Sequence, residues 1–263
     1  MLRFVGALSI LVLLVFVSVL YVLRPQPVAP LSLVFPILTI VFITSCSTVV
    51  AFVAVKAYSR ERLLSVLFLG CGALVFGYTS LFAAVLLGTE GQEFSATVLA
   101  IGAGVSAVFH LVCAYLTFTG GSPKLGGARL AFLWMSLAAL SVALIVVVGA
   151  SGALPAFYVD GSGTSSLDRV VLGAAAATFA TSAGVIFVVF SSSRSAVLYW
   201  YSLALAATAV GLVGVAVSNG DMTALPMRAG WATLYLGGVL LVTSVLSAER
   251  LGATSPGRES ASA

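Results

Sequence analysis

The single histidine of the chain, His110, lies in an apolar stretch, GVSAVFHLVCAY at 104–115. Small or polar residues recur around it at spacings of four, four, three and four. This period places them in one stripe along one face of a helix. Because lipid disfavours such a stripe, we expect it to face other helices, with its small residues allowing close approach. The stripe consists of Gly102, Ser106, His110, Cys113 and Thr117.

We expect His110 to form a hydrogen bond across a helix interface. Desolvation inside a membrane favours the neutral imidazole, which offers one donor and one acceptor. Partners are available in TSCST at 44–48 and in GCGALVFGYTS at 70–80. A simple packing role is the alternative. If a ligand binds, we expect its cavity to lie between the helices carrying these stretches, beside His110. The candidate ligand-binding residues are His110, Ser106, Cys113, Tyr78 and Thr117.

Catalysis and cofactor binding are not expected. A metal hydrolase needs several converging ligands, and this chain has one histidine. Cys46, Cys71 and Cys113 form no CxxC pair and suit packing roles. A haem held by His110 would need a second axial ligand, for which Met135 is the only methionine within the bundle.

The composition identifies the class of protein. The 263 residues are 61% hydrophobic and 8% charged, with a mean hydropathy of +1.19. A soluble domain carries roughly 25% charged residues. The apolar residues form blocks of about 20, long enough to cross a hydrocarbon core, where only helices or closed barrels satisfy the backbone. The sequence predicts an all-α polytopic integral membrane bundle with eight spans, at 4–23, 31–55, 63–88, 95–118, 129–150, 170–190, 196–218 and 229–247.

Loop charge predicts the orientation. With the N-terminus in the cytoplasm, every basic residue lies inside except Arg24, Arg169 and Arg228. Such a bias is typical of cytoplasmic loops, so both termini are expected in the cytoplasm and the protein in the plasma membrane. The net charge of +4 then indicates contact with the inner leaflet, and no nucleic acid is expected as a partner.

Turn and charge signals predict the connections between spans. They include KAYSRER at 56–62, GTEGQE at 88–93 and SSSR at 191–194, the last short enough to force an antiparallel helix pair. The longest, at 151–169, has room for local structure. The aromatic run at 199–201 is expected at the membrane interface.

The two ends of the chain differ in character. The first span lacks an A-x-A-like cleavage site, so we expect an uncleaved anchor; cleavage would leave seven spans. The transmembrane domain is expected to end at residue 248. Residues 249–263 are polar and are expected to form a disordered cytoplasmic tail.

The function classes narrow because no Asp, Glu, Lys or Arg lies near the centre of a predicted span. Such charges mark proton pumps, ion-coupled transporters and voltage sensors. We therefore predict a non-enzymatic membrane protein that senses or binds a small apolar or amphipathic ligand. Two alternatives stay open: an anchor subunit of an electron-transfer complex, where His110 meets a quinone or a partner-held cofactor, and a facilitator for a neutral solute. The expected partners are the lipid bilayer and a membrane or cytoplasmic protein. The sequence is also compatible with a homo-oligomer.

Residues 49–118 resemble the seven-helix membrane-associated sensor regions that precede histidine kinases and cyclase-type output domains. The resemblance is carried by VVAFVAVKAYSRERLLSVLFLGCGALVFGYTSLF and by HLVCAY in the next span. A basic inner turn followed by an FLGxGxLxxG-type helix is typical of these regions. The resemblance implies sensing within the membrane but assigns no site residue. Since the chain ends in SAERLGATSPGRESASA, a signal would pass to a separate partner.

Overall fold

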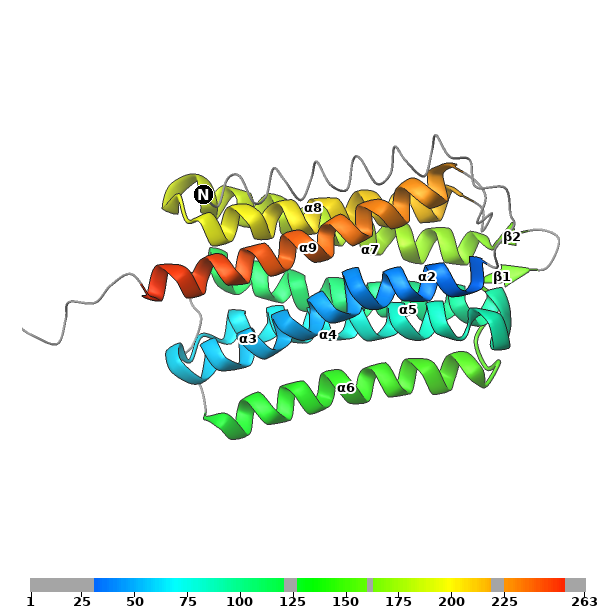
Figure 1. The fold of residues 1–263 in the computed structure, drawn as a ribbon, viewed down its shortest axis with the longest axis horizontal. Coiled ribbons are helices and arrows are strands. Elements are labelled where there is room, and N and C mark those ends of the chain that lie inside the picture. The colour runs from blue at the N-terminus through cyan, green and yellow to red at the C-terminus, as the bar shows by residue number, and fades with distance from the viewer. Residues whose placement is uncertain (1–30, 121–126, 160–162, 219–224, 254–263) are drawn as a thin grey trace, which may run out of the picture.

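The computed structural model describes residues 31–120, 127–159, 163–218 and 225–253, and nearly all of them are helical (Figure 1). The predicted first span, 4–23, lies outside these residues. The elements are α2 (Leu31–Thr39), a π-helical turn η1 (Ile40–Thr44), α3 (Ser45–Glu61), α4 (Leu64–Val85), α5 (Leu87–Phe118), α6 (Ala128–Ala150), β1 (Tyr158–Val159), β2 (Gly163–Thr164), α7 (Ser166–Ser193), α8 (Ala196–Val217) and α9 (Leu225–Ala253).

Seven helices in the described part of the chain are long and apolar enough to cross a membrane. Each coincides with one of the predicted spans that follow the first, so the prediction of a helical bundle is confirmed. The first of the seven, Val34–Glu61, combines most of α2 with η1 and α3. The number of spans in the whole chain, and the orientation, stay predictions.

Six of these spanning segments form a closed arrangement, and α6 lies outside it. Going around, α3 packs on α4, α4 on α5, α5 on α7, α7 on α8, α8 on α9, and α9 returns to α3. α6 contacts mainly α4 and α5 and forms one edge of the molecule (Figure 1). We call the enclosed part the ring interior, and it contains most of the buried side chains.

The outer surface is strongly apolar. Phe132 on α6 is 76% exposed and Phe52 on α3 is 70% exposed. In a soluble protein, exposed apolar surface on this scale would mark an interaction site or an aggregation risk. Spread along seven long helices, it fits contact with lipid, so the described part of the chain has the properties of a multi-pass membrane protein.

Two predicted connections are shorter in the structure. The predicted break at 56–62 is confirmed only at its end, because α3 continues to Glu61 and Arg62 adopts a left-handed conformation (φ 59°) before α4 begins at Leu64. In the predicted connection at 191–194, α7 continues to Ser193, and Arg194 ends it in the same left-handed conformation (φ 53°). Charged side chains indicate where a span leaves the hydrocarbon, but a helix can continue into water.

The other predicted connections also contain structure. The helix persists on both sides of Gly91, where a φ of 86° kinks the chain inside the predicted break at 88–93. Within 151–169, β1 pairs with β2 as an antiparallel hairpin. Ser165 then caps α7 by accepting a hydrogen bond from the backbone N–H of Asp168 (3.2 Å). We call this side of the molecule the hairpin end.

The C-terminal end of the described chain is helical, since α9 continues to Ala253, into the segment predicted to be a tail at 249–263. Residues beyond Ala253 lie outside the described part.

Candidate functional site

His110 lies on α5 and is buried in the ring interior, with 3% of its surface exposed. A Cβ built on Gly72 of α4 would lie 2.8 Å from His110 Nε2, so the ring packs directly on the glycine backbone. The Phe179 ring of α7 lies beside the imidazole, with centroids 5.5 Å apart. Only a residue without a side chain at position 72 leaves room for the histidine here.

The hydrogen-bond partner of His110 is Tyr201, whose hydroxyl lies 2.8 Å from Nδ1. Tyr201 belongs to α8, so the expectation of a partner from 44–48 or 70–80 is wrong. Tyr201 is 2% exposed and faces protein, and its predicted position at the membrane interface stays a prediction. A neutral imidazole can donate to or accept from this hydroxyl, depending on its tautomer. Nε2 has no hydrogen-bond partner among the described residues.

The remaining stripe residues on α5 also face the ring interior or its edge. Gly102 contacts the side chain of Thr79 on α4 at a distance that leaves no space for a methyl group. The Ser106 hydroxyl donates to the carbonyl oxygen of Gly72 (2.8 Å). The prediction that small residues allow α5 to approach another helix closely is therefore confirmed, and that helix is α4.

The other predicted site residues fall into two groups. Cys113 is buried one turn from His110, and its thiol contacts the Tyr201 hydroxyl. Thr117 donates to the Cys113 carbonyl oxygen (2.8 Å) and so bonds within its own helix. Tyr78, by contrast, is half-buried in a cluster with α6, and its hydroxyl lies 3.4 Å from Thr48 Oγ1. The structure brings Ser106, His110 and Cys113 together and places Tyr78 elsewhere.

A cavity of about 20 Å³ lies beside His110 in the ring interior. Its polar lining comes from Ser47, His110 and Thr208. A space of this size holds about one water molecule. The helices of 31–55, 63–88 and 95–118 all line the cavity, as expected. The prediction is incomplete, because α7, α8 and α9 line it as well. The apolar lining consists of Ile43, Ala73, Phe76, Phe179, Ala204, Leu205, Leu234, Gly237, Gly238 and Leu241.

The cavity adjoins an irregular turn of the first described span. Within η1, Ile43 lines the cavity and the Thr44 hydroxyl bonds the carbonyl oxygens of Gly77 (3.1 Å) and Thr39 (3.3 Å). Gly238 of α9 packs on the backbone carbonyl of Phe42. π-helical turns often occur at functional sites. The helix wall is therefore least regular next to the cavity.

The described residues contain no group of three or more His, Cys, Asp or Glu side chains that could hold a metal ion. Sequence reasoning missed Tyr201 and the α7 to α9 wall of the cavity. The aromatic run Tyr199 to Tyr201 indicates only that the three rings point in different directions around the helix, so it does not identify Tyr201 as the partner of His110.

Comparisons with family models, with curated proteins and with solved structures found no match to this chain. The likeness of residues 49–118 to membrane-associated sensor regions therefore stays a resemblance.

Proposed function

We propose that this chain is a non-enzymatic multi-pass membrane protein that binds or senses a small apolar or amphipathic ligand in the cavity beside His110. The supporting observation is the position of the imidazole. One ring nitrogen is held by Tyr201, the other has no partner among the described residues, and the ring lines a cavity where all helices of the ring meet. A ligand there touches every one of these helices, so binding can shift how they pack.

The size of the cavity limits the ligand. As it stands, the space fits about one water, so a larger ligand binds only when lining side chains such as Phe76 and Phe179 move aside. The irregular turn η1 and the Gly237–Gly238 pair border the same space, and these are the segments where we expect the helices to separate. We therefore propose a ligand of few heavy atoms.

The two alternative functions have less support from the geometry. A cofactor held by a partner protein could not reach His110 without separating α5 from its neighbours, since the side chain is buried. A cavity of about 20 Å³ is also far smaller than a path for a solute across the bundle.

Thermal unfolding of the purified chain in mild detergent tests the proposal, with benzene, indole and short-chain alcohols as probes. A probe at 100 times its Kd stabilises the native state by about 2.7 kcal/mol, so the Tm rises with probe concentration. Ala204 lines the cavity, and Ala204→Val narrows it. We expect this variant to lose the rise in Tm.

Ala180→Val, at an exposed position of α7, is the matched control and should keep the rise. Equal rises in both variants would show that the probes bind elsewhere. The absence of any rise in the wild-type protein would leave His110 with a packing role alone.

A further inference from the structure

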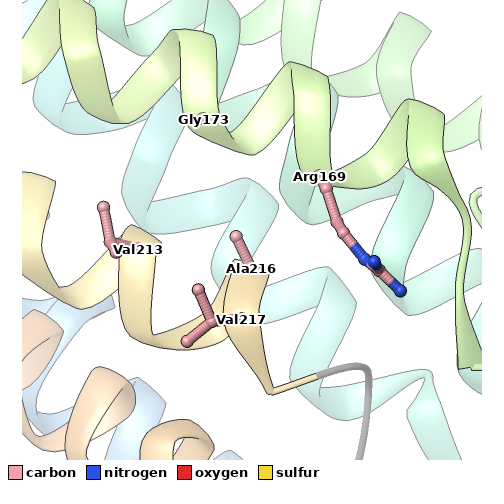
Figure 2. A pocket seen from close by; sticks show the side chains of 5 residues that line it. All are labelled: Arg169, Gly173, Val213, Ala216 and Val217. Carbon is pink, nitrogen blue, oxygen red and sulfur yellow. The ribbon is translucent and has the colours of Figure 1, made fainter.

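A second, larger hollow lies between α7 and α8 at the hairpin end, away from the His110 cavity. Its volume is about 600 Å³, and it is lined by Arg169, Gly173, Val213, Ala216 and Val217 (Figure 2). Binding sites for small molecules commonly have volumes of about 300–1,000 Å³. Figure 2 shows the Arg169 side chain extending along one edge, with the valines on the facing helix.

The lining changes in character along the helices. Arg169 lies in the first turn of α7, at the end of the span, and Gly173 lies one turn deeper. On α8, Val217 is the last helical residue and Val213 lies one turn deeper. A cation thus lies at the end of the helices and apolar surface lies toward their middle. A phospholipid has the same order, with a charged headgroup above acyl chains.

The groove has depth because position 173 carries no side chain. A Cβ built on Gly173 would meet no atom within 4 Å, so the space beside it is open. Val213 and Val217 are both exposed on the opposite wall. An acyl chain laid against Gly173 would therefore contact apolar surface from both helices.

Arg169 is placed to bind an anion. Its guanidinium donates to the Thr164 carbonyl oxygen of β2 (3.3 Å), which fixes the side chain against the hairpin. Arginine has five N–H donors in a planar fork that matches phosphate, so it can bind a backbone carbonyl and a phosphate together. The neighbouring carboxylate of Asp168 interacts electrostatically with Arg169, but it is 1% exposed and does not line the hollow.

We infer that this hollow binds one anionic phospholipid, with its phosphate at Arg169 and an acyl chain in the groove between α7 and α8. Charge complementarity and the order of charged and apolar lining carry the inference. It is independent of the ligand proposed for the His110 cavity, because the two sites share no lining residue.

Native mass spectrometry of the full chain, in detergent with equal amounts of phosphatidylglycerol and phosphatidylcholine, tests the inference. We expect the wild-type protein to retain phosphatidylglycerol in preference. Arg169→Gln removes a charged partner of the phosphate and should weaken this binding about tenfold. Gly173→Leu fills the groove and should reduce the retention of the lipid as well.

Two matched controls separate this site from general effects. Arg228→Gln removes another exposed arginine near the start of α9, and Gly184→Leu adds a side chain at an open, exposed position of α7. Both should retain phosphatidylglycerol like the wild-type protein. Circular dichroism establishes that each variant is folded, and Gly173→Ala replaces Gly173→Leu if the larger side chain prevents folding.

Three results would overturn the inference. The first is equal retention of both lipids by the wild-type protein. The second is an equal loss in Arg169→Gln and Arg228→Gln, which would indicate general electrostatic attraction. The third is a groove that takes no lipid while Gly173→Leu lowers stability, which would indicate that another part of this chain fills it.

Discussion

At the scale of single residues, the contact between His110 and Tyr201 explains the isolated imidazole. The two residues are 91 positions apart, and their hydrogen bond ties α5 to α8 across the ring interior. The period of the stripe predicts that His110 faces protein. The identity of the partner depends on which helices are neighbours, and no local pattern contains that information. Tyr201 lies close to the start of a span, where the sequence predicts an interfacial position but no particular partner.

Tyr201→Phe should lower stability, because it leaves His110 Nδ1 without its partner in an apolar interior. We expect a loss of about 1 kcal/mol in the free energy of unfolding, since hydrogen bonds within membranes contribute modestly. Tyr199→Phe is the control, because Tyr199 is 36% exposed. Denaturant unfolding in mild detergent measures both. Equal losses would show that the hydrogen bond does not stabilise the bundle.

At the scale of helices, the interface between α4 and α5 holds the candidate site in place. Gly102 contacts Thr79, and Gly72 contacts His110, so each helix presents a glycine to a larger side chain of the other. The helical period and the small residues predict this face correctly. The ends of helices are harder to predict, because α3 and α7 continue past the apolar residues until Arg62 and Arg194 turn the chain.

Gly102→Ala and Gly104→Ala form a matched pair on α5. A methyl group at position 102 would overlap Thr79, whereas one at position 104 would meet no atom within 4 Å. We expect Gly102→Ala to destabilise the protein by about 1–3 kcal/mol, as overpacking does. Gly104→Ala should be neutral or stabilising, because alanine favours helix. Thermal unfolding that ranks the two variants the other way would refute close packing of α4 and α5.

Arg194→Gly tests how α7 ends. A left-handed conformation costs a residue with a side chain roughly 1 kcal/mol relative to glycine, so this variant should be more stable by up to that amount. Arg129→Gly removes an exposed arginine from the first turn of α6 and should instead lower stability by up to about 1 kcal/mol. Chemical denaturation compares them, and a loss of stability in both would mean that the arginine charge matters more than the backbone.

At the scale of the whole molecule, composition and segment length predict a bundle of membrane spans, and seven apolar helices agree with it. The arrangement in space could not be predicted, because nearly every helix is apolar on several faces. The sequence therefore does not show that α6 lies outside the ring, nor that α7, α8 and α9 complete the cavity. These features depend on side-chain shapes that fit only in one packing.

Orientation is a prediction for the whole molecule that labelling can test. Ser151, at the hairpin end, should face outside, and Ser193, at the opposite end, should face the cytoplasm; both are exposed. On intact cells, a membrane-impermeant maleimide should label Ser151→Cys, and should label Ser193→Cys only after permeabilisation. The parent chain, whose three cysteines lie within spans, is the control. The reverse labelling pattern would invert the topology.

The most direct test of a ligand beside His110 is mass spectrometry of small molecules that co-purify with the gently extracted protein, together with its optical spectrum. We predict a small apolar or amphipathic compound, depleted in Ala204→Val and His110→Ala but retained in Ala180→Val and Arg169→Gln. A Soret band would indicate bound haem and would contradict the prediction that the site holds no cofactor. A ligand-free wild-type protein, with His110→Ala merely less stable, would contradict ligand binding and make His110 an interhelical hydrogen-bonding residue.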